Sequence, residues 1–287
     1  MGPTARRRLA AALAASAAAA ALAVGGGPAA LSAAGEPSKA TDVADGPFTS
    51  GSGGGDAVVA PAARVRTAQA QDALAAARRA AARQTAPPRA AIAVVTGDAV
   101  AVRDRPGGRV ALRLAATTEF GTARRLGVVE RRGRWLGVTV PDLPNGTLGW
   151  VDARGGAVRI ERTRWSLHAD LSDRTLLLRR DGRPVRRITV AIGTPSSPTP
   201  TGRFAVTDKL DGTAYGPYYG CCVLALSATQ PNLPAGWTGG NRMAIHGTDA
   251  PDTIGAAASA GCLRAADDDL RALMDRVPVG TPVVIGR

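Results

Sequence analysis

The chain has 287 residues, enough for one large or two ordinary domains, and a formal net charge of +13. A charge of this size is compatible with nucleic acid, an anionic membrane or an acidic polymer as partner. No basic run is interleaved with aromatic residues, so no nucleic acid partner is predicted. The alternative, that an arginine- and alanine-rich composition reflects codon bias, stays open, and charge alone does not identify the function.

The first 35 residues have the layout of a secretory signal. Three arginines, Arg6 to Arg8, precede an uncharged alanine-rich run from Leu9 to Val24, and small residues follow at Ala33 to Gly35. The apolar run is short for a spanning helix, although an uncleaved anchor is the alternative. We therefore expect residues 1–35 to be a signal peptide. The predicted location is outside the cytoplasm, in the cell envelope or cell wall.

Residues 36–88 have the composition of a flexible linker. The segment contains a Gly-Ser-Gly-Gly-Gly run and ends at Pro87 and Pro88. Residues 62–83 favour a helix, but their apolar positions are nearly all alanine and bury little surface. We expect a tether between the N-terminus and the folded part.

Short runs rich in Val, Leu and Ile begin at Ala91 and are separated by turn signals. The turns fall at residues 105–108, 132–133 and 144–146, and Trp135 and Trp150 lie on the strand-like segments between them. This spacing predicts a small β-barrel over residues 89–157, with the tryptophans in its core rather than in a ligand groove. The Trp-Leu-x-Val and Gly-Trp-Val segments resemble a bacterial SH3-like module.

Residues 158–287 are predicted to form a second domain, also mainly β. Asp181-Gly182 between two apolar runs is a strong hairpin signal. Further strands are expected at 203–206 and 223–227, and residues 279–285 are expected to form a turn and a final strand. A short helix is expected at 265–277, with Asp267 to Asp269 in its first turn. Consecutive carboxylates point around a helix rather than converging, so no metal site is predicted there.

The candidate catalytic pair consists of His246 and Cys262, members of two rare residue types in this chain. A cysteine nucleophile needs a base close in space, which a loop that folds back provides, and Gly261 lets the backbone approach a substrate. The pair alone is equally compatible with a buried structural cysteine and a core histidine.

Cys221 and Cys222 bear on the same interpretation. They are adjacent in an apolar run and are expected to be structural, on a strand. If they bond to each other or are buried, Cys262 is the free thiol. A disulfide from either one to Cys262 would remove the catalytic interpretation.

The residues around the pair are His246-Gly247-Thr248 and Ser259-Ala260-Gly261-Cys262-Leu263-Arg264. They resemble the signature of the L,D-transpeptidase catalytic domain (YkuD) family, with Ala260 where that family usually has histidine. Upstream, residues 190–193 and 198–204 resemble the family's V-x-x-G and TP-x-G-x-F segments. The resemblance covers residues 164–285 and implies a β-sandwich-type catalytic domain with a short helix after the cysteine motif.

This resemblance implies an exported peptidoglycan L,D-transpeptidase. Cys262 would attack a stem-peptide carbonyl while His246 accepts its proton, D-alanine would leave, and an acceptor amine would resolve the thioester to a 3→3 cross-link. The carbonyl of Gly247 would orient the imidazole, and the amides of Gly261 and Cys262 would hold the oxyanion. The expected partners are stem peptides and carbapenem-type inhibitors, with no cofactor and a monomeric chain.

Four further residues are predicted to bind substrate: Arg264, Ser259, Trp237 and Tyr219. Arg264 either pairs with a substrate carboxylate or braces its loop. Trp237 lies in a loop rich in Pro and Gly, and either covers the substrate or pins that loop to the core.

Other classes of function stay open. A cell-wall cysteine peptidase or carboxypeptidase would resolve the same thioester with water. An inactive wall-binding protein is compatible with Ala260. A zinc site is the weakest alternative, because His246 and Cys262 are two ligands and a structural site wants four.

Overall fold

The computed structural model describes residues 71–73, 76, 89–237 and 240–287. The predicted signal peptide, residues 1–35, lies outside the described residues, as does nearly all of the predicted linker, of which residues 71–73 and 76 are helical. Within the described ranges, no helix is long and apolar enough to cross a bilayer.

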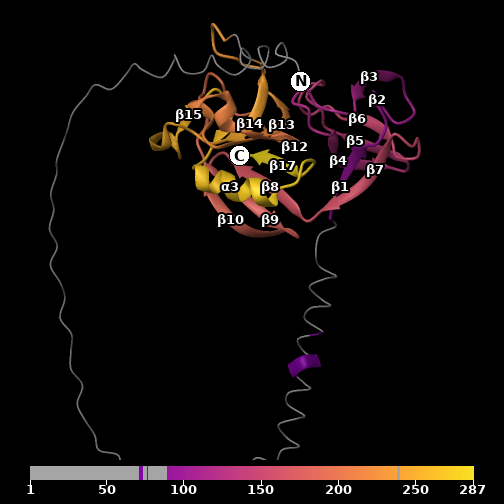
Figure 1. Cartoon of the computed structure of the whole chain (residues 1–287), viewed down its shortest axis with the longest axis horizontal. Helices are drawn as coiled ribbons and strands as arrows, with labels where there is room; N and C mark the ends of the chain where they lie inside the picture. The colour runs from indigo at the N-terminus through magenta and orange to yellow at the C-terminus, as the bar shows by residue number, and fades with distance from the viewer. Residues whose placement is uncertain (1–70, 74–75, 77–88, 238–239) are drawn as a thin grey trace, which may run out of the picture. The chain divides into compact units, whose positions relative to one another are not determined.

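The first part of the folded chain is a seven-stranded antiparallel sheet, drawn in magenta tones in Figure 1. Its strands are β1 (Ala90–Val95), β2 (Ala99–Arg103), β3 (Val110–Ala115), β4 (Arg125–Arg132), β5 (Trp135–Val138), β6 (Gly149–Asp152) and β7 (Val158–Thr163). Across the sheet they follow the order β3-β2-β6-β5-β4-β1-β7. β7, which the sequence analysis assigned to the second domain, pairs with β1 along its whole length. The SH3-like resemblance stays a prediction.

The predicted turns join strands of this sheet. Residues 105–108 separate β2 from β3, Gly133 with φ +58° closes the hairpin of β4 and β5, and residues 144–146 lie between β5 and β6. Trp150 is buried at 5% exposure, in agreement with a core role. Trp135 is half-buried instead, with the guanidinium of Arg134 5.1 Å from its ring centroid.

The second part is an eight-stranded mixed sheet in the order β10-β9-β8-β17-β12-β13-β14-β16. Its strands are β8 (Trp165–Asp170), β9 (Thr175–Arg180), β10 (Arg183–Thr189), β12 (Gly202–Asp211), β13 (Cys222–Thr229), β14 (Arg242–His246), β16 (Leu263–Arg264) and β17 (Pro282–Gly286). β8 with β17 and β14 with β16 are parallel pairs, and the other pairs are antiparallel. A parallel two-stranded sheet joins β11 (Ile192–Gly193) to β15 (Ala257–Ser259).

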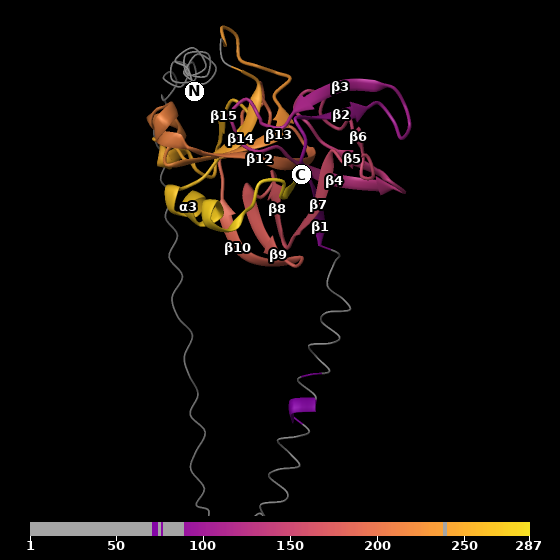
Figure 2. The ribbon, with the colours of Figure 1, turned by 45° about the vertical axis from the view of Figure 1, so that its right-hand side comes forward.

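The helix predicted after the cysteine motif is α3 (Asp267–Arg276), which lies against the second sheet in both Figure 1 and Figure 2. Its buried side chains Leu270 and Leu273 join one core cluster with strand residues such as Leu224 and Ile245. Three short 3₁₀ helices complete the described elements: η2 (Gly212–Tyr215), η3 (Pro217–Tyr219) and η4 (Pro251–Thr253). The prediction of a mainly β fold with a short helix in this position is confirmed.

The Asp181-Gly182 hairpin is also confirmed. β9 and β10 pair next to the turn, Arg180 with Arg183, and the two turn residues have φ values of +50° and +76°. A type I′ turn requires positive φ at both central residues, and Asp and Gly tolerate it better than most. Two local residues therefore fixed the register of this edge of the sheet.

Buried and partly buried polar contacts join the two sheets. Ser227 Oγ of β13 donates to Thr139 Oγ1 at 2.9 Å. Asn145 receives the Thr229 N–H on Oδ1 at 3.0 Å and donates from Nδ2 to the Thr229 carbonyl at 2.6 Å.

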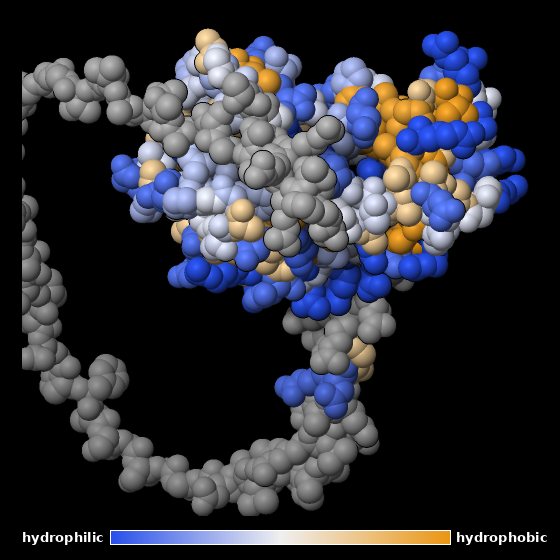
Figure 3. All heavy atoms as spheres, turned by 45° about the horizontal axis from the view of Figure 1, so that its top comes forward, coloured by the Kyte–Doolittle hydropathy of each residue, from blue (hydrophilic) through white to orange (hydrophobic). Residues whose placement is uncertain are grey.

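In Figure 3 hydrophobic residues gather on the right, over the part that forms the first sheet, while hydrophilic residues cover most of the remaining coloured face.

Replacing Asn145 by Ala should destabilise the protein by about 1–3 kcal/mol, because both peptide groups of Thr229 lose their partner at the sheet contact. Urea unfolding measures the change. Asn232→Ala is the matched control, since this side chain is exposed. Equal effects of the two substitutions would contradict a structural role for the Asn145 contact.

Candidate active site

The fold brings His246 and Cys262 to one pocket. His246 is the last residue of β14, and Cys262 directly precedes β16, the parallel neighbour of β14. The loop between them therefore leaves and rejoins the sheet at the same place. Both side chains line a pocket with an apolar, aromatic wall that includes Tyr219 and Trp237.

The imidazole of His246 is fully buried and oriented by one hydrogen bond. Its Nδ1 lies 2.6 Å from the carbonyl oxygen of Gly247. A carbonyl only accepts, so Nδ1 carries the proton and Nε2 presents its lone pair. Nε2 has no hydrogen-bond partner in the part of the chain that the structure describes. The orienting role predicted for the Gly247 carbonyl agrees with this geometry.

Burial keeps both members of the pair neutral. Burial lowers the pKa of His246 to about 3. The positive charge of Arg264 also lowers this pKa, whereas the hydrogen bond to Gly247 raises it. Apolar surroundings raise the pKa of the Cys262 thiol, against a backbone hydrogen bond from Ala244 and the charge of Arg264. A neutral imidazole beside a neutral thiol favours general-base transfer over a preformed ion pair.

The loop that carries Cys262 is fixed by its own side chains. Ser259 Oγ donates to the Cys262 carbonyl at 2.6 Å and accepts the Gly261 N–H at 3.0 Å. The amide of Gly261 is thus already engaged, so its predicted part in an oxyanion hole is not supported. The amide of Cys262 is the donor left from the predicted pair. Ser259, predicted to bind substrate, is 2% exposed and holds the loop instead.

Two residues that the sequence analysis did not identify as site residues, Gln230 and Thr199, hydrogen-bond to the backbone of the same loop. Gln230 Nε2 donates to the Ala260 carbonyl at 2.9 Å and to the Pro198 carbonyl at 3.1 Å. Thr199 Oγ1 donates to the Gly261 carbonyl at 2.7 Å. Gly261 has φ +119°, and a Cβ there would lie 2.1 Å from Gln230 Nε2. Thr199 belongs to a segment that the family resemblance flagged, whereas no sequence signal pointed to Gln230.

The tyrosines of η3 pack on the imidazole. The ring centroid of Tyr219 is 4.9 Å and that of Tyr218 5.6 Å from that of His246. Tyr219 is 4% exposed, so its contact with the imidazole is a packing contact. These two aromatic rings limit the rotation of the imidazole and reduce its contact with water.

Arg264 is buried and holds Tyr218, one of the two tyrosines that pack on the imidazole. It is 7% exposed, its Nη2 donates to the Tyr218 hydroxyl, and its Cζ lies 4.5 Å from the Tyr218 ring centroid. These contacts correspond to the bracing alternative. Trp237 is half-buried, lines the pocket and donates from Nε1 to the Gly240 carbonyl at 3.0 Å. For Trp237 the two alternatives, covering the substrate and pinning its loop, both stay open.

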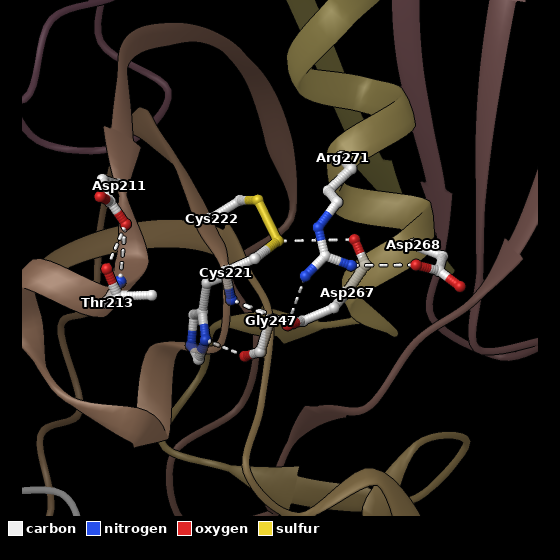
Figure 4. The surroundings of a disulfide bond; sticks show 9 residues. Asp211, Thr213, Cys221, Cys222, Gly247, Asp267, Asp268 and Arg271 are labelled. Carbon is white, nitrogen blue, oxygen red and sulfur yellow. Dashed lines mark hydrogen bonds and ion pairs between the residues drawn. A yellow bond between two sulfur atoms is a disulfide. The ribbon is translucent and has the colours of Figure 1, made fainter.

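Cys221 and Cys222 form a disulfide with each other, and Cys262 is free. The bond lies close to Gly247 and Asp267, as Figure 4 shows. The Cys222 carbonyl accepts the Gly247 N–H at 3.1 Å, and the Cys221 N–H donates to the Asp267 carboxylate at 3.1 Å. A Cβ on Gly247 would lie 2.2 Å from Asp267 Oδ1, so this carboxylate packs directly against the turn.

No group of three or more His, Cys, Asp or Glu side chains among the described residues is arranged to hold a metal ion. The Asp267 carboxylate instead receives the Cys221 amide and pairs with Arg271 at 3.5 Å.

The chain is similar to known proteins over its second domain. Residues 164–285 match the model of the L,D-transpeptidase catalytic domain, YkuD. The Bacillus subtilis protein YqjB, named an L,D-transpeptidase, is 35% identical over 103 residues, which cover 33% of this chain and 56% of that protein. The Bacillus subtilis protein YkuD, also named an L,D-transpeptidase, is 30% identical over 125 residues, which cover 43% of this chain and 66% of that protein. The chain thus spans less than two thirds of the length of either relative.

Among solved structures, L,D-transpeptidase 3 from Mycobacterium tuberculosis, in complex with a faropenem-derived adduct, is similar with a TM-score of 0.37 and 16% identity. The similarity covers 56% of this chain and 97% of that chain.

The cysteine pairing predicts a defined thiol count. Unfolded without reductant, the protein should react with one equivalent of a thiol reagent at Cys262, and with three after reduction. The double variant Cys221→Ser, Cys222→Ser should lose only about 1 kcal/mol of stability from chain entropy, because adjacent cysteines close a minimal loop. Three equivalents before reduction would contradict the disulfide, and a loss of several kcal/mol in urea unfolding would contradict the small entropic role.

The buried imidazole predicts a pH-dependent stability. The pKa of His246 is about 3 in the folded state against 6.5 as the ordinary value. Below pH 6.5 the unfolded chain binds a proton that the folded chain does not bind until about pH 3, so stability falls as the pH drops through this window. Between pH 6.5 and pH 5 the loss should be about 2 kcal/mol.

Urea unfolding of the wild type and of His246→Gln at pH 7 and pH 5 measures this loss as a double difference. His168 is common to both proteins and cancels. Parallel pH dependence of the two proteins would show that His246 titrates normally and is not desolvated.

Proposed function

Because residues 164–285 belong to the YkuD family of L,D-transpeptidase catalytic domains, we propose that this chain is an L,D-transpeptidase with Cys262 as its nucleophile and peptidoglycan stem peptides as its substrates. One observation carries the proposal. A free thiol and the unpaired Nε2 of a neutral, fully buried imidazole line the same pocket.

In the first half-reaction the Cys262 sulfur attacks the carbonyl carbon of the donor peptide bond. His246 Nε2 accepts the thiol proton. Nε2 carries no proton of its own, because the imidazole N–H is at Nδ1 and donates to the Gly247 carbonyl. The tetrahedral intermediate collapses, the C–N bond to D-alanine breaks, and the imidazolium returns the proton to the leaving amine. The products are a thioester on Cys262 and free D-alanine.

In the second half-reaction an acceptor amine attacks the thioester carbonyl. His246 takes a proton from the amine and returns it to the sulfur as the C–S bond breaks, which leaves an amide, the 3→3 cross-link. Water in place of the amine would give a hydrolysed peptide. Burial of the imidazole supports the amine route, since the apolar pocket wall reduces access of water to the thioester.

The lowered pKa of His246 has two consequences for this role. The imidazole is neutral at physiological pH, so Nε2 is available to accept a proton, and it is a weaker base than a solvated imidazole. The raised pKa of Cys262 means that the thiolate forms only as the proton moves to Nε2. The amide of Cys262 is the proposed oxyanion donor, and such donors contribute roughly a hundredfold or more in rate.

The proposed setting is the cell wall. The signal-like residues 1–35 and the linker that follows support export and a tethered or released enzyme that works on wall peptides. β-Lactams of the carbapenem and penem classes are proposed inhibitors, since their strained carbonyl can acylate a free thiol such as that of Cys262.

The proposal predicts one covalent adduct when the protein is mixed with faropenem or a carbapenem and weighed intact. The adduct should vanish in Cys262→Ala, fall by at least about tenfold in rate in His246→Gln, and persist in the double variant Cys221→Ser, Cys222→Ser. The double variant is the matched control, because it removes the other two cysteine sulfurs and leaves the residues that line the pocket unchanged.

Product analysis with a stem tetrapeptide, with and without an acceptor amine, then separates the functions. A cross-linked dimer supports the transpeptidase. A hydrolysed tripeptide in both reactions indicates a carboxypeptidase, and no turnover by a folded protein indicates the inactive wall-binding alternative.

A further inference from the structure

One wall of the catalytic pocket comes from the other domain. Phe120 lies between β3 and β4 of the first sheet, and it lines the same pocket as His246 and Cys262. The other described lining residues all belong to the second domain, from Leu210 onward. We call residues 116–124, which carry Phe120, the finger loop.

The finger loop is a tight turn with its own hydrogen bonds. The Thr118 N–H donates to the Thr122 carbonyl at 2.8 Å, and the Gly121 N–H to the Thr118 carbonyl at 3.0 Å, with Gly121 at φ +83°. The buried guanidinium of Arg124 donates to the carbonyls of Ala115 at 2.7 Å and Thr117 at 2.8 Å. The position of Phe120 at the tip is therefore set before any ligand binds.

Two contacts fix the loop on the catalytic domain. Thr118 Oγ1 donates to Asp208 Oδ1, a fully buried carboxylate on β12. Glu119 pairs with Arg242 of β14 at 2.7 Å, and the Arg242 Cζ lies 6.0 Å from the Phe120 ring centroid. β14 also ends in His246, so one strand carries the anchor of the finger loop and the catalytic base. β4, the strand that follows the finger loop, packs against β12 and β17.

The chemistry of the pocket defines what it accepts. Its described lining includes Phe120, Tyr215, Trp237 and the 40% exposed Leu233, and contains no carboxylate. Its one cationic lining side chain in the described chain, Arg242, is paired through Nη2 with Glu119, and its buried Nη1 has no partner among the described residues. The aromatic and aliphatic side chains of the lining favour burial of an apolar group.

We propose that the first domain is part of the substrate-binding site, with Phe120 as a specificity-determining residue. It contacts an apolar, aliphatic or aromatic, portion of the acyl donor beside the reacting carbonyl. This inference rests on the proposed function for the identity of the donor, but not for the existence of the apolar subsite next to the Cys262 thiol.

Alkylation of Cys262 tests the subsite without any turnover. The sulfur displaces iodide from iodoacetamide or from its N-benzyl derivative, and the two rate constants are followed by intact mass on the non-reduced full chain. We expect the ratio of the N-benzyl rate to the plain rate to fall about fivefold in Phe120→Ala, with the plain rate within about twofold of wild type. Phe120→Leu, which keeps apolar bulk, should retain most of the ratio.

Val110→Ala is the matched control, an exposed apolar residue of the same sheet outside the pocket, and should leave the ratio unchanged. Glu119→Gln, which breaks the pair with Arg242 and keeps Phe120, should lower the ratio partly. If Phe120→Ala does not fold, Glu119→Gln decides the question. An unchanged or raised ratio in folded Phe120→Ala, or in Glu119→Gln where Phe120→Ala does not fold, overturns the proposal.

Turnover separates this inference from the proposed function. With a stem-peptide donor, Phe120→Ala should raise KM about fivefold with kcat nearly unchanged, because the contact is made in the ground state and the transition state alike. If the wild type neither turns over nor forms a β-lactam adduct, the proposed function fails, while the alkylation ratio still decides whether Phe120 forms the apolar wall.

Discussion

The site depends on one short hydrogen bond, from Nδ1 of His246 to the carbonyl of the next residue, Gly247. It fixes the tautomer, so the lone pair of Nε2 is on the far side of the ring. The rest of the local structure holds Gly247 in place: its amide donates to Cys222, and the Asp267 carboxylate fills the space where a Cβ would be. The disulfide and the first turn of α3 thus act on the imidazole through a single peptide group.

Burial then sets the protonation of the pair. The same burial that packs aromatic rings on the imidazole lowers its pKa, and the apolar surroundings raise the pKa of the thiol. Both shifts favour the uncharged forms of the imidazole and the thiol. Ser259, Gln230 and Thr199 occupy the polar groups of the cysteine loop, which leaves few backbone groups to compete for the substrate.

The two sheets share the site rather than standing apart. Thr118 and Glu119 of the finger loop contact β12 and β14, the strands that build the catalytic pocket. The Asn145 and Ser227 contacts join the sheets at the far end of β13. An accessory domain fixed at several points can contribute a side chain to a pocket with the precision of a core residue, and Phe120 is in such a position.

Local sequence determined the elements and pointed to the candidate catalytic pair. Asp181 and Gly182 specified their hairpin because they tolerate positive φ, and acids followed by spaced leucines specified α3. The resemblance of the residues around Cys262 to the YkuD signature pointed to the proposed nucleophile. Only the tertiary structure decided that Gly261 gives its amide to Ser259, that Gln230 clamps the loop, that Arg264 holds Tyr218, and that Phe120 enters the pocket. These contacts depend on which groups the folded chain brings close together. Residues far apart in sequence become neighbours only in the tertiary structure.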